Sequence, residues 1–180
     1  WAWNGYEGQK CRVEVYGCGD HVSLFLNGVR QGTKSLKRKC RVSFHLPYHP
    51  GVLTAILYNE KNEEIGSSSL LSLDGQKKLT LEPEKRETAP GKLCYVRLRV
   101  TDGAGTTDVL ARDKVRIQVK GGELLAFGHA CPYNNDGYNR DETTVYRGEA
   151  MVILRAEASG VMHLTAASSC GIAEIEITVR

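Results

Sequence analysis

The sequence lacks long apolar runs, which argues against a membrane, and it lacks an excess of charge of either sign, which argues against a polyanionic partner. No stretch approaches the roughly 20 apolar residues of a membrane span, and no charged segment followed by a short apolar segment opens the chain. Lys and Arg together number 24 against 21 Asp and Glu, which gives a net charge of +3. This charge is too small to indicate a polyanionic surface as a partner. We therefore expect neither a nucleic-acid partner nor a membrane.

The densest basic segment, residues 34–41, also lacks the features of a nucleic-acid site. It holds five basic residues with no aromatic side chain between them. Sites for single-stranded nucleic acid combine basic and aromatic side chains. We interpret the segment as a solvated loop between strands, with a polyanion site as the alternative.

Regular cysteine spacing is also absent. There is no Cys-x-x-Cys pair and no spacing typical of a disulfide framework or a zinc knuckle. The six cysteines are Cys11, Cys18, Cys40, Cys94, Cys131 and Cys170. We expect most of them to be free thiols, which favours a reducing compartment such as the cytoplasm. The chain begins at Trp1 and its only methionines are Met151 and Met162, so we expect an excised or processed piece of a longer protein.

The clearest local signal that is present is a β-hairpin over residues 22–32. Val22, Leu24 and Leu26 occupy every second position, as expected for a strand with one buried face. Asn27-Gly28 then supplies the two residues with positive φ that a type I′ turn requires. The hairpin indicates an antiparallel β fold.

Short alternating segments continue along the whole chain. They are expected at residues 10–17, 40–46, 51–58, 64–73, 79–82, 92–101, 114–120, 123–127, 143–146, 149–156, 161–167 and 172–179. No 3.6-residue period persists for three turns, so helices should be minor. A polar turn at residues 74–78 separates two series of strands. We predict an all-β protein of two tandem antiparallel Ig-like β-sandwich domains, residues 1–75 and 76–180.

No constellation of residues indicates catalysis or cofactor binding. Glu60 is the best candidate for a general acid or base, but the polar residues around it indicate a hairpin tip where its pKa stays ordinary. The serines at 67–69 and 168–169 lack a Gly-x-Ser-x-Gly elbow. The glycine pairs at 103–105 and 121–122 lead into further strands and not into a helix that could bind phosphate. We expect no catalytic residue and no cofactor.

Three groups of residues have some character of a metal site. His45 and His49 are four residues apart, but Pro47 excludes a helix that would bring them together. His129 and Cys131 form a similar pair, and in neither case are a third and fourth ligand evident. The Asn- and Asp-rich residues 134–141 do not have EF-hand spacing, and such turns form without calcium. We expect no metal.

The aromatic residues Trp1, Trp3 and Tyr6 are the remaining candidates for a site. They could stack on a sugar ring, or they could pack against another domain. We favour packing, because the cluster stands at the first residues of the chain.

Four segments of the first half resemble family 2 glycoside hydrolases just after their catalytic barrel. WAWNGYEG (1–8) is similar to the tryptophan-rich exit from that barrel, and CRVEVY (11–16) is similar to the strand that follows. VSLFLNG (22–28) resembles the family's VELFLNG hairpin, and PYHPGVL (47–53) resembles its Pro-Tyr-x-Pro-Gly-x-Leu turn.

The second half is similar to the terminal Ig-like domain of the same enzymes. The matching segments are YVRLRVTD (95–102), GELLAFG (122–128), TVYRGEAMVILR (144–155) and GVMHLTA (160–166). One loop departs from the family. Where many relatives carry Gly-Asn-Gly-Asp-Pro, this chain has Gly128-His129-Ala130-Cys131-Pro132, so no role of that loop is carried over.

The resemblance implies a parent enzyme of the β-galactosidase type whose two catalytic glutamates lie in an upstream barrel. No residue of this chain matches those positions. We therefore expect a non-catalytic C-terminal region whose partners are the upstream barrel of the same protein and, in an oligomer, neighbouring subunits. The alternative from another class is an Ig-like module that binds glycans or acts in adhesion, which should expose aromatic side chains on one face.

Overall fold

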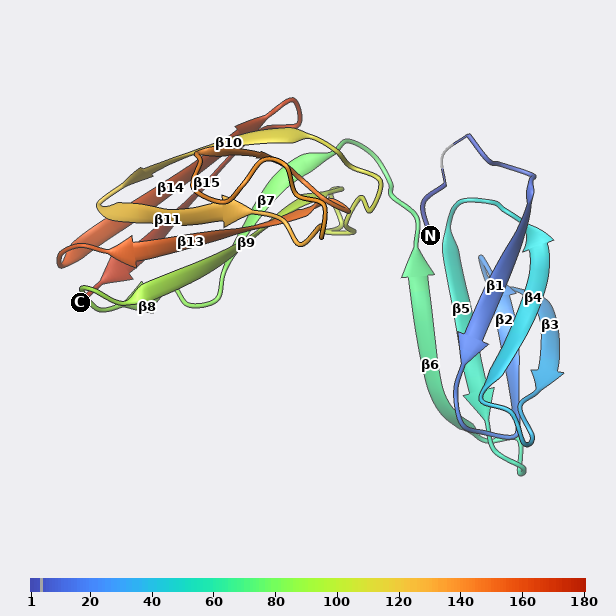
Figure 1. Ribbon diagram of the computed structural model, residues 1–180. Coiled ribbons are helices and arrows are strands. Elements are labelled where there is room, and N and C mark those ends of the chain that lie inside the picture. Colours follow the sequence, from blue (N-terminus) through green and yellow to red (C-terminus); the bar gives the residue numbers. More distant parts are fainter. Residues whose placement is uncertain (4) are drawn as a thin grey trace. The chain divides into compact units, whose positions relative to one another are not determined.

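A computed structural model describes residues 1–3 and 5–180 (Figure 1). All of the regular structure in this range is β-strand, in agreement with the predicted fold class. The chain divides into two compact units, Trp1–Leu73 and Asp74–Arg180, which we call unit 1 and unit 2. No helix in the described residues is long and apolar enough to cross a membrane.

Unit 1 is an antiparallel sandwich of a two-stranded sheet and a four-stranded sheet. The small sheet pairs β1 with β4, and the large sheet has the order β3-β2-β5-β6. The strands are β1 (Lys10–Tyr16), β2 (His21–Leu26), β3 (Val29–Ser35), β4 (Arg41–Pro47), β5 (Val52–Tyr58) and β6 (Glu64–Leu71). Every strand of this half was predicted to within three residues at each end, because each has period-2 alternation or a clear turn beside it.

The predicted hairpin is the connection between β2 and β3. Leu26 pairs with Val29, and the two turn residues have positive φ, 50° at Asn27 and 79° at Gly28. The Asn27 side chain also joins this turn to the start of β5. Its amide donates to the carbonyl of Pro50 at 3.0 Å, and its Oδ1 accepts the N–H of Val52 at 2.8 Å. One residue thus fixes two turns at the same end of the sandwich.

The buried core of unit 1 is small. Its members are Val22, Leu24, Leu26, Leu36, Phe44, Leu46 and Leu53. They come from the inward faces of β2, β4 and β5 and from the loop after β3. The two-stranded sheet does not cover the whole four-stranded sheet, since all eight residues of the edge strand β6 are exposed.

Unit 2 is a larger sandwich of a four-stranded and a five-stranded sheet (Figure 1). The four-stranded sheet has the order β11-β13-β9-β7, and the five-stranded sheet has the order β12-β10-β14-β15-β8. The strands are β7 (Lys78–Pro83), β8 (Glu87–Thr88), β9 (Leu93–Thr101), β10 (Lys114–Lys120), β11 (Gly122–Gly128), β12 (Glu142–Thr144), β13 (Glu149–Ala156), β14 (Gly160–Ser168) and β15 (Gly171–Val179). The sequence did not predict β8, which has two residues and pairs in parallel with β15.

The core of unit 2 is filled from both sheets. Val96 and Leu98 of β9, Val152 of β13 and Phe127 of β11 are fully buried and face β10, β14 and β15. A β-bulge between Leu124 and Ala126 shifts the register of β11. After the bulge, Phe127 lies opposite Val152 in the core, while its neighbour Ala126 points to the outer face of the sheet.

Buried Asp102 fixes the first residues of unit 2. Its carboxylate accepts the N–H of Asp74 at 3.0 Å and the N–H groups of Ala104 and Thr106 at 2.9 and 2.8 Å. These hydrogen bonds favour the ionised form and hold the pKa of Asp102 below its usual value, with the Asp74 bond as the largest cause. The turn after β9 and the chain that enters β7 are therefore held by one carboxylate.

Candidate functional site

The structure separates the three aromatic residues that the sequence grouped as a candidate site. Trp1 packs edge-on against Tyr48, with ring centroids 5.1 Å apart, and its indole N–H donates to the carbonyl of His49 at 2.9 Å. Tyr48 is 2% exposed, and its hydroxyl accepts the N–H of Trp3 at 3.0 Å. Trp1 thus belongs to the edge of the unit 1 core.

Trp3 and Tyr6 remain available for a partner. Their side chains are 54% and 55% exposed, and a turn joins them, in which the N–H of Tyr6 donates to the carbonyl of Trp3 at 3.1 Å. Asn4, which belongs to the same sequence motif, lies outside the described residues. Two aromatic rings on one turn leave a surface suited either to a sugar ring or to another domain.

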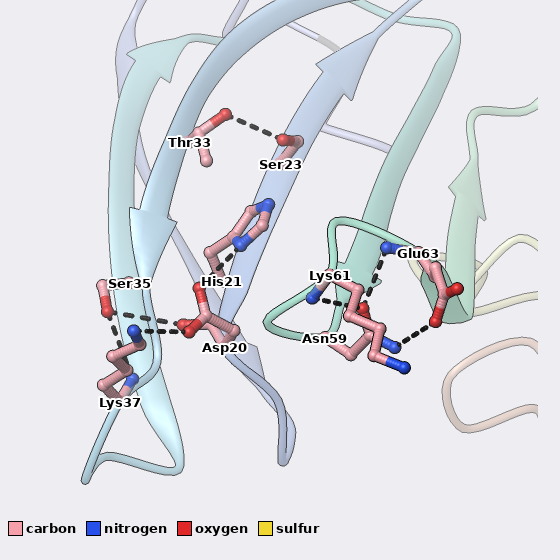
Figure 2. A network of polar contacts seen from close by, with 9 residues as sticks. All are labelled: Asp20, His21, Ser23, Thr33, Ser35, Lys37, Asn59, Lys61 and Glu63. Carbon is pink, nitrogen blue, oxygen red and sulfur yellow. Dashed lines mark hydrogen bonds and ion pairs between the residues drawn. The ribbon is translucent and has the colours of Figure 1, made fainter.

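Glu60 lies at the exposed tip between β5 and β6, where the sequence placed it. The side chain of Asn59 organises this tip (Figure 2). Its Oδ1 accepts the N–H groups of Lys61 and Glu63 at 3.0 and 2.9 Å, and its amide donates to the Glu63 carboxylate at 2.7 Å. These contacts account for the polar residues of the tip as a turn.

A network around Asp20 is the polar cluster that the sequence did not indicate (Figure 2). The Asp20 carboxylate contacts Nδ1 of His21 and Nζ of Lys37, both at 2.9 Å. These two partners, His21 first, hold the pKa of Asp20 below its usual value. The imidazole also stacks on Tyr58, with ring centroids 5.0 Å apart.

This His-Asp pair does not form part of a hydrolytic triad. Ser23 is the nearby hydroxyl on the same strand, but it is 4% exposed and its Oγ lies 2.7 Å from Oγ1 of Thr33. Such a hydroxyl cannot reach a substrate. The network instead ties the basic loop after β3 to the start of β2, since the carbonyl of Asp20 accepts the N–H of Leu36 at 2.8 Å.

The candidate metal residues are exposed or engaged in other contacts. His45 is an exposed residue of β4 opposite Arg12, and Nδ1 of His129 accepts the N–H of Cys131 at 3.2 Å. Asp136 accepts the N–H of Thr144 at 2.9 Å, and this hydrogen bond is the main cause that lowers its pKa. Within the described residues no three His, Cys, Asp or Glu side chains are grouped as metal ligands would be.

A pocket of about 630 Å³ lies on the outer face of the sheet β11-β13-β9-β7 of unit 2. Ala126, Met151 and Ile153 line its floor. Tyr138, from the loop after β11, and Tyr146, from the segment between β12 and β13, line its walls. Sequence reasoning missed the pocket because its residues come from several separate segments, each of which shows only a strand or loop pattern.

Comparison with known proteins identifies the family. The glycoside hydrolase family 2 C-terminal domain 5 matches residues 78–178, which is more than half of the chain. The chain belongs to this family. A domain of unknown function (DUF4982) matches residues 8–66. The family 2 domain thus covers nearly all of unit 2, including every residue that lines the pocket.

The relatives of this family 2 chain are longer proteins. The β-galactosidase BoGH2A of Bacteroides ovatus is 26% identical over 175 residues, which are 92% of this chain and 20% of BoGH2A. The crystal structure of a family 2 member from Bacteroides cellulosilyticus has a TM-score of 0.92 and 29% identity, over 100% of this chain and 24% of that one. A β-glycosidase from Bacteroides vulgatus shares the fold, with a TM-score of 0.87 and 23% identity, over 99% of this chain and 24% of that one.

The chain therefore spans about a fifth to a quarter of the length of the relatives that it matches. It corresponds to the C-terminal region of family 2 glycoside hydrolases and does not include their catalytic barrel. The resemblance found in the sequence is confirmed.

Proposed function

We propose that this chain is the accessory C-terminal region of a β-galactosidase and that it supports the catalytic barrel of the same protein. The observation that carries the proposal is the match to BoGH2A, which extends over nearly the whole chain and only a fifth of that enzyme. In this proposal the two domains are residues 1–75 and 76–180, and catalysis belongs to the barrel.

Three features of unit 1 and unit 2 support this role. The carboxylates with shifted pKa that lie in the loops, Asp20, Asp102 and Asp136, accept hydrogen bonds from the protein itself and hold turns in place. Glu60 is exposed at the tip between β5 and β6. Trp3 and Tyr6 present two exposed aromatic side chains in one short segment, and aromatic rings with a polar end are well suited to an interface with another domain.

A graft into a relative tests the supporting role. The segment of BoGH2A that matches this chain is deleted, and in a second variant it is replaced by residues 1–180. We expect the deletion to remove most of the soluble, active enzyme and the graft to restore turnover of a small chromogenic β-galactoside at least partly. Full activity of the deletion variant would overturn the supporting role.

The isolated chain provides the second test. We expect purified residues 1–180 to show no turnover of the same galactoside above buffer. Turnover that is lost in Glu60→Gln would contradict the proposal, and Glu64→Gln on the neighbouring strand is the matched control. In the graft, replacing both Trp3 and Tyr6 by serine should reduce the restored activity if these rings contact the barrel.

A second function, glycan binding by an Ig-like module, is favoured by one observation. Unit 2 carries an aromatic-lined pocket that the supporting role does not require.

A further inference from the structure

We propose that the pocket on the outer face of unit 2 binds a pyranose sugar as a non-catalytic site. The choice of sugars as the ligand class rests on the proposed function, while the pocket itself rests on geometry. The volume of about 630 Å³ falls within the range of roughly 300–1,000 Å³ that is typical of small-molecule sites. Every lining residue belongs to unit 2.

The floor of the pocket is flat and apolar. Ala126 of β11 lies opposite Ile153 of β13, and Met151 lies two residues before Ile153 on the same strand face. Met151 is 41% exposed although it is apolar and stands in the centre of a sheet. The short side chain of Ala126 beside the longer Met151 and Ile153 leaves room above the sheet. One apolar face of a pyranose ring can lie there.

Tyr138 forms one wall, and the backbone holds it there. Its carbonyl accepts the N–H of Phe127 at 2.8 Å, so the loop returns to the end of β11. Its ring lies on Gly128, where a Cβ atom would be 2.3 Å from the ring carbon Cδ1. Only glycine permits this approach. The ring is nevertheless 52% exposed, which leaves one side available to a ligand.

Tyr146 forms a second wall, and two guanidinium groups and an imidazole lie around its ring. The guanidinium groups of Arg112 and Arg147 lie 5.2 and 5.6 Å from the ring centroid, and the His129 ring lies at 5.9 Å. Arg147 begins a two-residue turn with φ of 53°, followed by Gly148 with φ of 74°. A bulky residue in this left-handed region is unusual and is often associated with a functional site. The turn places a guanidinium at the rim of the pocket.

A donor and an acceptor stand side by side at the same rim. Arg97 of β9 donates to the Glu149 carboxylate of β13 at 3.2 Å, and both residues line the pocket. Their side chains are 54% and 38% exposed, so water can be exchanged for ligand hydroxyls. A guanidinium beside a carboxylate matches neighbouring sugar hydroxyls, because each hydroxyl both donates and accepts hydrogen bonds.

Together these features give the pocket an apolar floor, two aromatic walls and a polar rim. A pyranose has the same division, with C–H groups on its faces and hydroxyls at its edge. Since β13 is hydrogen-bonded to β11 on one side and to β9 on the other, the floor and the backbone positions of Arg97 and Glu149 are fixed before a ligand arrives.

Calorimetric titration of the 180-residue chain is the first test. The probes are methyl β-galactoside, a galactose-terminated tetrasaccharide and methyl β-glucuronide. We expect dissociation constants of about 0.1–10 mM, typical of a weak and exposed site. Amide shifts in NMR spectra should be confined to β13, to residues 126–149 and to the part of β9 around Arg97. The highest probe concentration, 50 mM, is about five times the weakest dissociation constant expected. If none of the three probes binds at this concentration, the proposal is overturned.

Two substitutions of residues that line the pocket should weaken binding. Tyr138→Ala removes a wall, and Arg97→Ala removes the donor from an exposed strand position where the fold is not at risk. We expect each to raise the dissociation constant about tenfold, which corresponds to about 1.4 kcal/mol. Tyr133→Ala is the matched control, since Tyr133 is 85% exposed in the same loop and does not line the pocket. Binding that all three variants retain would place the sugar elsewhere and contradict the proposal.

The glucuronide distinguishes the neutral and acidic sugars. Arg97 is paired with Glu149, so Arg147 is the second guanidinium among the described residues that line the pocket, and it can meet a ligand carboxylate. Arg147→Asn keeps a residue that tolerates positive φ and should weaken the glucuronide alone. If Arg147→Asn weakens binding of the galactoside and of the glucuronide equally, the pyranose site is still supported and Arg147 also contacts neutral sugars.

The sugar-binding test and the graft test of the supporting role can fail independently of each other. The graft is assayed with the pocket intact on a small chromogenic galactoside, whereas sugar binding is measured on the isolated chain. Restored catalysis without sugar binding would overturn the pocket alone. Sugar binding without restored catalysis would overturn the supporting role alone.

Discussion

The two units have the same kind of architecture but are stabilised in different ways. The core of unit 1 contains seven buried hydrophobic residues, and this unit spans 73 positions of the sequence. The core of unit 2 contains twenty, over 107 positions. Buried apolar area is the main favourable term in folding, so unit 2 has by far the larger share. In unit 1 a larger part of the stability must come from turns and polar contacts.

The contacts at the ends of unit 1 agree with this view. Asn27 joins two turns, and the Asp20 network joins the loop after β3 to the start of β2. In unit 2 the sheet β11-β13-β9-β7 lies on a complete core and can carry an open pocket on its other face. A binding site needs such a rigid floor. The sandwich with the larger core, unit 2, is therefore the one that provides such a floor.

The largest expected effect comes from the unit 2 core. Phe127→Ala leaves a cavity at a fully buried position and should lower the free energy of unfolding of unit 2 by about 3–5 kcal/mol. Both tryptophans of the chain lie in unit 1, so their fluorescence reports unit 1 alone, while circular dichroism reports both units. The variant should shift the unfolding transition of unit 2, which only circular dichroism reports, and should leave the fluorescence transition unchanged.

The matched change in unit 1 is Leu24→Ala, at a position 1% exposed. It should cost about 2–5 kcal/mol and move the fluorescence transition instead. In the unmodified chain we expect the fluorescence transition to come first. A single shared transition for both signals would mean that the two units do not differ in stability as their cores suggest.

The second effect concerns the β2–β3 turn. Asn27→Ala removes two side-chain hydrogen bonds. It also places alanine, which tolerates positive φ less well than Asn, at φ of 50°. We expect the free energy of unfolding of unit 1, measured in urea, to fall by about 2–3 kcal/mol. Asn27→Gly keeps the backbone conformation but loses the same bonds, so it should cost about half as much. Equal losses in the two variants would show that backbone strain contributes nothing.

The smallest effect is a pH dependence of unit 2. Because the pKa of Asp102 is lowered in the fold, its stabilising contribution is complete above about pH 3.9 and is lost as the pH falls through the folded value. Asp102→Asn should cost about 1 kcal/mol at pH 6 and should reduce the loss between pH 6 and pH 3. Urea titrations followed by circular dichroism at both pH values measure this. An unchanged acid sensitivity would assign it to other carboxylates.

Asp20 gives the corresponding comparison in unit 1. Its pKa is lowered by His21 and Lys37, so its contribution is also lost at low pH. Asp20→Asn should reduce the acid sensitivity of the fluorescence transition and leave that of unit 2 unchanged.

Much of the fold could be predicted because its signals are local. Alternation placed the strands, and Asn27-Gly28 placed a turn that the backbone angles bear out. The pocket could not be predicted, since it depends on register. The bulge in β11 decides that Ala126 and not Phe127 faces outward, and no local pattern marks that bulge.

Long-range partners were also beyond the reach of local patterns. Asp20 and His21 are adjacent in the sequence, but their third partner, Lys37, was part of a basic run with no feature that singled it out. Similarly, Trp1 was grouped with Trp3 and Tyr6 by proximity in the chain. Tyr48, from a distant turn, covers Trp1 and leaves the other two rings exposed.

The edge strand β6 has a consequence for how the protein behaves at high concentration. It pairs with β5 on one side only, and its apolar residues Ile65, Leu70 and Leu71 are about half exposed. An open edge of this kind invites strands of other molecules to add to the sheet. The three serines at its centre, Ser67, Ser68 and Ser69, separate Ile65 from Leu70 and Leu71, so the apolar surface along the strand is interrupted. The strand thus keeps its hydrogen-bonding edge while the composition of its middle discourages fibril formation.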